Sequence, residues 1–146
     1  MIPLAVLTAG FCLFFLVGLA GNQYLADYHH ALRPALAIMF LLTASAHWGA
    51  KRVDLLRMVP PVLGRPALWV TVTGLLEIAG AIGLLIPATA TLAAGGLALL
   101  LLALFPANIR AARLHLTLGG RAVSKLRRRA LIQVIFFLCV LLASRH

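Results

Sequence analysis

The sequence predicts an all-α protein, a polytopic bundle of transmembrane helices, on three observations. Of its 146 residues, 63% are hydrophobic and only 11% are charged, whereas soluble domains carry about 25% charged residues. Residues 1–26 and 78–109 contain no charged side chain, and roughly 20 apolar residues suffice to span a bilayer. The polar or proline-containing segments between the apolar runs are short. We therefore expect one membrane domain, residues 1–146, in contact with the lipid bilayer and containing five helices.

Each of the first two helices follows from an apolar run and its flanking residues. The run 2–21 is longer than the apolar region of a signal peptide, which has about 7–15 residues. We interpret residues 1–21 as an added N-terminal membrane helix. A polar stretch follows, and Pro34 suits the first turn of a helix because its missing N–H would be unpaired there. The second helix is expected at 34–49, continuing toward Lys51 and Arg52.

The remaining helices are separated by strong turn signals. Residues 58–66, MVPPVLGRP, contain three prolines and predict an irregular loop packed against the bundle. The third helix is expected at 67–86, and Pro87 opens the next turn. The fourth helix is expected at 91–109, with an extension as far as Gly119-Gly120 as an alternative. The fifth is expected at 130–144.

The net charge of +10 is explained by membrane topology rather than by nucleic-acid binding, which we do not expect. Short loops rich in Lys and Arg mark the cytoplasmic side of a membrane protein. With five helices, this rule predicts a bacterial cytoplasmic (inner) membrane protein with its N-terminus inside and its C-terminus outside. Eleven of the 13 basic residues lie in two loops that would then both be cytoplasmic: Lys51, Arg52, Arg57, Arg65, Arg110, Arg113, Arg121, Lys125, Arg127, Arg128 and Arg129.

Glu77 is the only candidate catalytic acid or base that the sequence offers. It lies near the middle of the third expected helix, where an ionised carboxylate is costly in a bilayer, so it should face the bundle interior. The small or hydroxylic neighbours Thr73 and Gly74 would allow another helix to approach closely. Two interpretations stay open. Glu77 takes part in ligand binding or proton chemistry, or it is a protonated side chain that hydrogen bonds helices together.

A pocket around Glu77 is predicted from the ends of two other helices. His47 ends the second expected helix and Asn108 ends the fourth, so both should lie at the same membrane face. Together they could line the mouth of a polar pocket, with Glu77 about two turns deeper and the 58–66 loop above it. The alternatives are a His47 bonded to a backbone carbonyl and an Asn108 that caps a helix. The predicted ligand-binding set is Glu77, His47, Asn108, Trp48, Thr73 and Pro60.

The residues predict neither a metal site nor an evident cofactor. Cys12 and Cys139 both fall inside apolar segments, and a zinc site needs more ligands than these two thiols supply. Haem is disfavoured because His47 is the only histidine clearly on an expected membrane helix. No glycine-rich phosphate loop is present.

Four separated motifs resemble the DoxX-like family of small bacterial integral membrane proteins. They are RPALAIMFLLTASAHW, MVPPVLGRP, TGLLEIAGAIGLLIP and ALFPANI, in this order. The resemblance covers about residues 33–144 and implies a four-helix core, to which residues 1–21 add a helix. The matching residues are Arg33, His47, Pro60, Gly74, Glu77, Pro87, Pro106 and Asn108.

The resemblance implies an accessory role in the membrane, because the family is associated with thiosulfate:quinone oxidoreduction and with other membrane redox complexes. The first expectation is a subunit that binds a hydrophobic small molecule, quinone- or lipid-like, in an intramembrane pocket around Glu77. An alternative is a chaperone-like or scaffolding protein with a membrane protein partner or a second copy of itself. A weaker alternative is a small lipid or sterol isomerase. One acid/base group is no complete catalytic constellation, so activity of the chain alone is not expected.

Overall fold

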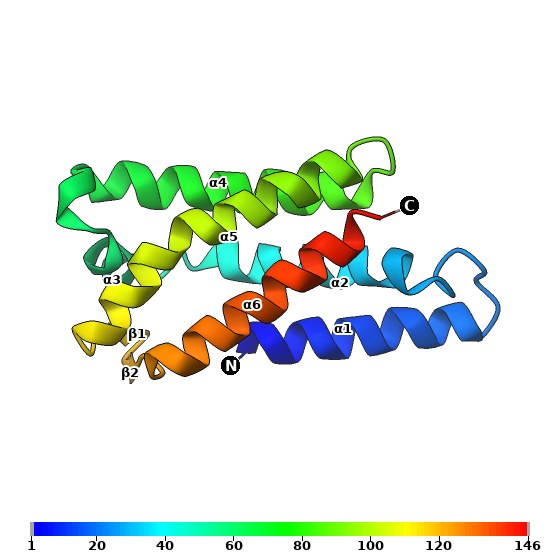
Figure 1. Cartoon of the computed structure of the whole chain (residues 1–146), viewed down its shortest axis with the longest axis horizontal. Helices are drawn as coiled ribbons and strands as arrows, with labels where there is room; N and C mark the ends of the chain where they lie inside the picture. The colour runs from blue at the N-terminus through cyan, green and yellow to red at the C-terminus, as the bar shows by residue number, and fades with distance from the viewer. Residues whose placement is uncertain (1, 146) are drawn as a thin grey trace.

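The computed structural model describes residues 2–145 and is a bundle of helices that run along one long axis (Figure 1). The long helices are α1 (Ile2–Leu19), α2 (Tyr28–Ser45), α4 (Pro66–Leu85), α5 (Ala90–Arg113) and α6 (Leu126–Ala143). The short elements are α3 (Arg52–Met58), the 3-10 turn η1 (Pro61–Leu63) and an antiparallel pair, β1 (Thr117–Leu118) and β2 (Arg121–Ala122). The predicted all-α class is confirmed for the described residues. By length and composition, α1, α4 and α5 could each cross a membrane.

Helix α2 lies at the centre of the bundle and packs against α1, α4 and α6. Its buried face is built from small and apolar side chains, such as Ala35 and Leu36, which are fully buried. A Cβ placed on Gly10 of α1 would lie 3.3 Å from the Cβ of Ala35. Small residues at this contact therefore let the two helices approach closely, as is common between membrane helices.

The boundaries expected for the second helix were wrong at both ends. It begins at Tyr28 rather than at Pro34, because the Asp27 carboxylate accepts a hydrogen bond from the His29 N–H at 2.8 Å and caps the helix there. Pro34 lies inside the helix. The helix ends at Ser45, and the expected continuation into Lys51 and Arg52 is instead a turn followed by the separate helix α3.

The proline-rich segment 58–66 is irregular, as predicted, apart from the single turn η1. Arg65 has a φ of 41°, in the left-handed region, and reverses the chain immediately before α4. Pro66 then occupies the first position of α4, where its fixed φ suits a helix start. The indole N–H of Trp69 donates to the Leu63 carbonyl at 3.2 Å, so the loop is tied to the first turn of α4.

Helix α5 extends past the expected Ile109 to Arg113 but does not reach Gly119-Gly120. Those glycines instead form the tight turn between β1 and β2, with φ values of 60° and 74°, which glycine adopts without steric cost. The Gly119 N–H donates to the Asp54 carboxylate at 2.8 Å, which ties this hairpin to α3. Helix α6 begins at Leu126, four residues before the expected start at 130, so three arginines lie in its first turn.

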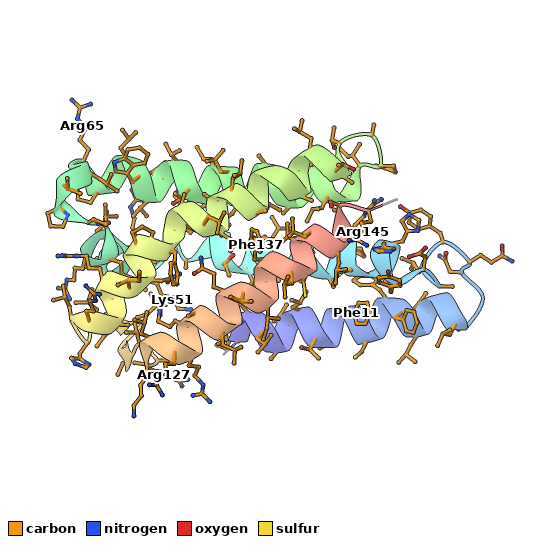
Figure 2. All side chains as sticks on the ribbon, viewed as in Figure 1. Phe11, Lys51, Arg65, Arg127, Phe137 and Arg145 are labelled. Carbon is orange, nitrogen blue, oxygen red and sulfur yellow. The ribbon has the colours of Figure 1, made fainter. Side chains whose placement is uncertain are left out.

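The two ends of the bundle differ strongly in charge. Figure 1 places α3, the β-hairpin and the start of α6 at one end, and the C-terminus with the α1–α2 and α4–α5 connections at the other. Lys51, Arg65 and Arg127 mark the first end in Figure 2, whereas Arg145 lies at the second. We call the first end the basic end. It carries the eleven basic residues of the two loop regions identified in the sequence.

Candidate functional site

Glu77 is buried between α4 and α2, where it pairs with a hydroxyl group. It is the twelfth residue of the 20-residue helix α4, about 16 Å from the helix start at 1.5 Å per residue. Its side chain is 5% exposed. The Thr43 hydroxyl of α2 lies 2.7 Å from Glu77 Oε2 and 2.9 Å from the Phe40 carbonyl oxygen. The carboxyl group therefore faces the bundle interior, as the sequence predicted.

The Thr43 hydroxyl has one proton and two acceptors within reach, so its bonding depends on the protonation of Glu77. When Glu77 is ionised, Thr43 donates to the carboxylate. When Glu77 carries a proton, the carboxyl O–H can donate to Thr43, whose own proton then goes to the Phe40 carbonyl. The same geometry thus provides a hydrogen-bond partner for Glu77 in both protonation states.

His47 and Trp48 lie against α4 one turn away from Glu77. A Cβ placed on Gly74 would lie 2.8 Å from two carbon atoms of His47 and 2.7 Å from Cη2 of Trp48. Gly74 and Glu77 are three residues apart, and residues at this spacing share a helix face. The absence of a side chain at Gly74 is therefore what lets the turn after α2 rest on the same face of α4 as Glu77.

The histidine itself is held by the backbone. His47 is buried, and its Nδ1 lies 3.1 Å from the Ala44 carbonyl oxygen. This agrees with the alternative expected from the sequence, a His47 bonded to a backbone carbonyl. A carbonyl can only accept, so the bond assigns a proton to Nδ1. Burial lowers the pKa of His47, and the nearby Arg52 lowers it further. Arg52 also donates to the His47 carbonyl at 2.6 Å and to the Thr71 hydroxyl at 2.9 Å, which fixes the turn.

Asn108 belongs to a different polar cluster, between α5 and α6. Its Nδ2 donates to Gln133 Oε1 at 2.7 Å, and its Oδ1 accepts from Arg129. Gln133 is buried, and its amide N–H donates to the Leu101 carbonyl of α5. Asn108 does not cap a helix end, because α5 continues to Arg113. The expected pocket mouth shared by His47 and Asn108 is therefore divided into two clusters, each at its own helix contact.

The last members of the predicted set have separate surroundings. The Thr73 hydroxyl donates to the Trp69 carbonyl of its own helix at 2.8 Å, so it is satisfied locally. Trp48 is 47% exposed and borders the surface near Glu77. Pro60 lies beside α5 instead of above Glu77. It lines a groove of about 350 Å³ at the basic end, together with Pro106, Ile109, Arg110, Arg113 and Leu114.

A second groove, of about 780 Å³, runs along the outer face of α5 and α6 and is almost entirely apolar. Gly95 and Gly96 form part of its floor, and a Cβ on either glycine would meet no atom within 4 Å. We call this the α5–α6 groove. Its other lining residues are Thr91, Leu92, Ala98, Leu99, Leu102, Phe137 and Leu141.

Sequence reasoning missed Thr43 and Gln133, the two residues that hold Glu77 and Asn108. The available signal was a hydroxyl group, one of two near the end of the apolar run of α2, and a lone amide in the apolar run of α6. Polar side chains inside membrane helices face protein and find a partner, but this rule does not say which one. Within residues 2–145, no three His, Cys, Asp or Glu side chains gather closely enough to hold a metal ion.

One family model matches the chain over residues 36–144, about three quarters of its length. Its description is "Domain of unknown function (DUF8561)". The match covers residues 36–45 of α2 and all later helices, and α1 lies before it. No curated protein and no solved structure matches the chain.

Proposed function

The chain belongs to the DUF8561 family, and we propose that it is a DoxX-like membrane accessory subunit that binds a hydrophobic small molecule, quinone- or lipid-like. The observation that carries this proposal is the Thr43–Glu77 pair, a buried carboxyl group with a hydroxyl partner at 2.7 Å near the middle of an apolar helix. Intramembrane carboxyl groups are costly, and they mark functional sites more often than ordinary packing.

The proposed protein crosses the bacterial cytoplasmic membrane five times. Helices α1, α4 and α5 have the length and composition of membrane spans. Helices α2 and α6 have 18 residues each, or about 27 Å at 1.5 Å per residue, against roughly 30 Å for the hydrocarbon core. The uncharged part of α6, residues 130–143, is only about 21 Å long, so the arginines of its first turn would extend toward the headgroups. The basic end would face the cytoplasm by the positive-inside rule, which places the N-terminus inside and the C-terminus outside.

The chemistry at Glu77 suits a ligand that offers hydrogen-bond acceptors on an apolar body. A protonated carboxyl can donate to a quinone or ester carbonyl, and an ionised one can accept from a hydroxyl. Thr43 is within hydrogen-bonding distance of Glu77 whether the carboxyl group is ionised or protonated. Glu77 could therefore lose or regain a proton and still have a hydrogen-bond partner. Trp48, half-exposed beside Gly74, would border the approach of an apolar ring from the bilayer.

Fluorescence quenching by decylubiquinone tests the proposal. The chain has two tryptophans, so a Trp69→Phe background leaves Trp48 as the only indole, next to the proposed site. We expect saturable quenching, and about two- to tenfold weaker binding in Glu77→Leu, because this variant lacks the carboxyl O–H that would donate to the quinone carbonyl. A hydrogen bond between neutral groups is worth about 0.5–1.5 kcal/mol.

Thr8→Val is the matched control, because among residues 2–145 the Thr8 hydroxyl bonds only to the Leu4 carbonyl of α1. This variant should bind as the background does. Linear quenching without saturation, or equal affinity in Glu77→Leu, would reject the small-molecule proposal.

A second candidate function, scaffolding of partner membrane proteins, is supported by α1. Only Leu7 and Gly18 of this 18-residue helix are buried, so one side of α1 is open to lipid or to another membrane protein. Its exposed leucines include Leu13 and Leu16. The test is a pulldown in gentle detergent that compares the full chain with Leu13→Ala/Leu16→Ala, which keeps α1 folded against α2. A stoichiometric partner lost in the variant supports scaffolding. A partner-free protein in both samples rejects it.

A further inference from the structure

The groove at the basic end combines cations with an apolar wall, and the Glu77 proposal makes no use of it. It measures about 350 Å³, within the range of roughly 300–1,000 Å³ typical of small-molecule sites. Pro60 comes from the loop before α4, and the other lining residues come from the last turns of α5 and the residue after it. From this composition we infer that the groove binds the headgroup of an anionic phospholipid, with part of an acyl chain along the apolar wall.

The position of the groove along α5 matches a membrane interface. Residues 78–109 carry no charge, and Arg110 is the first charged side chain that follows. Arg113 comes three residues later and so lies on the same helix face. Both arginines therefore stand where an apolar span gives way to charge, at the depth of lipid headgroups. Ile109 and Pro106 line the groove on the side toward the apolar span.

The cations of the groove are available to a ligand. Arg110 uses its Nε to donate to the Arg57 carbonyl at 3.3 Å. This bond orients the guanidinium and leaves its two terminal nitrogens available to a ligand. No described residue forms a hydrogen bond or ion pair with the Arg113 side chain, which is exposed. A guanidinium matches a phosphate group in a forked geometry, and such charge-assisted bonds are strong.

Little negative charge competes with a bound phosphate. Asp54 is the acidic residue of this end, and its carboxylate already accepts from the Gly119 N–H at 2.8 Å and lies 3.9 Å from Arg57. The two other acidic residues of the chain are Glu77, inside the bundle, and Asp27, at the start of α2. The basic end thus has strong charge complementarity to anionic lipid, and the apolar lining of Pro60, Pro106, Ile109 and Leu114 favours a lipid over a free phosphate.

Native mass spectrometry of the delipidated full chain, titrated with lipid in detergent, tests this site. The wild type should retain phosphatidylglycerol well above phosphatidylcholine. One basic side chain near an anionic surface contributes about fivefold to binding, so Arg110→Gln/Arg113→Gln should bind phosphatidylglycerol about 25-fold more weakly. Arg127→Gln/Arg128→Gln is the matched control, because it removes the same charge from exposed positions of the same end outside the groove. It should stay within a few-fold of the wild type.

Three outcomes would overturn the inference. If both double variants lose the same affinity for phosphatidylglycerol, the lipid is attracted by the overall charge of the basic end and not by the groove. If phosphatidylglycerol and phosphatidylcholine bind equally well, the site does not distinguish an anionic headgroup from a zwitterionic one. If glycerol 3-phosphate binds as strongly as phosphatidylglycerol, the apolar wall contributes nothing to the affinity. The single variant Arg113→Gln, which breaks no bond among the described residues, keeps the test valid if the double variant misfolds, and it should lose about fivefold. Glu77→Leu should bind phosphatidylglycerol normally, so this test is independent of the quinone experiment.

Discussion

Replacing Gly74 with alanine tests the contact that positions His47 and Trp48 on α4. The added Cβ would lie 2.7–2.8 Å from atoms of these two side chains, whereas carbon atoms in good contact are about 3.5–4.0 Å apart. One side must therefore move by roughly 1 Å. His47 cannot yield easily, since its ring bonds to the Ala44 carbonyl and its own carbonyl is held by Arg52.

The expected magnitude follows from two opposing effects. Overpacking of a tight contact costs about 1–3 kcal/mol, while alanine is favoured over glycine inside a helix by about 0.8–1.0 kcal/mol. Gly74→Ala should therefore lower the free energy of unfolding by up to about 2 kcal/mol. Gly95→Ala is the matched control, because the same change on α5 meets no atom within 4 Å. It should raise the free energy of unfolding by up to about 1 kcal/mol.

The assay is reversible unfolding in mixed micelles with increasing SDS, followed by circular dichroism, with Trp48 emission as a local readout. The difference in unfolding free energy between Gly74→Ala and Gly95→Ala should be about 1–3 kcal/mol. Trp48 emission should shift in the first variant and stay unchanged in the second. Equal stabilities with unchanged emission would refute the close approach of His47, Trp48 and α4.

Three further predictions concern the polar contacts of α2 and its following turn. In a double-mutant cycle, Thr43→Val and Glu77→Leu should couple by about 0.6 kcal/mol, the average for hydrogen bonds between membrane helices, and by no more than about 1.7 kcal/mol. Additive effects would mean that the pair contributes no stability. Arg33 is buried and donates to the Ala143 and Arg145 carbonyls. Arg33→Met should therefore speed amide hydrogen exchange in the last turn of α6. Unchanged exchange would mean that these two hydrogen bonds do not hold the end of α6. Because burial lowers the pKa of His47 from its usual 6.5, the unfolded chain takes up its proton first as pH falls. Wild-type stability should then decline below about pH 6.5, and His47→Gln should reduce this decline; parallel pH profiles in both proteins would contradict the buried, neutral imidazole.

The sequence predicted the helices well where an apolar run ends at a strong local signal. The expected third helix differs from α4 by one residue at each end, because proline stops mark both ends. The start of α2 was misplaced because Pro34 resembles a helix start, while the cap at Asp27 stands in a polar stretch with few helix signals. Helix α3 was missed because seven residues are too few for a clear periodic pattern.

The candidate site was predicted in part, for a physical reason. That Glu77 faces the interior followed from the cost of exposing a carboxyl group to lipid. Its partner Thr43 is 34 residues away in sequence, and no local pattern shows which turn of α2 meets which turn of α4. For the same reason, sequence reasoning grouped Asn108 with His47, although its hydrogen bonds go to α6.

Composition and local pattern were enough to establish the class of protein: apolar, helical, basic at specific loops, and with a lone acidic residue inside a long uncharged stretch. These properties depend on composition and on neighbours along the chain. The tertiary structure decided which polar groups meet, because helix contacts are set by small residues such as Gly10 and Gly74 that fix how closely two helices approach. It also brought Pro60 beside Arg110 and Arg113 at the basic end, a juxtaposition that arises only when the loop before α4 packs against the end of α5.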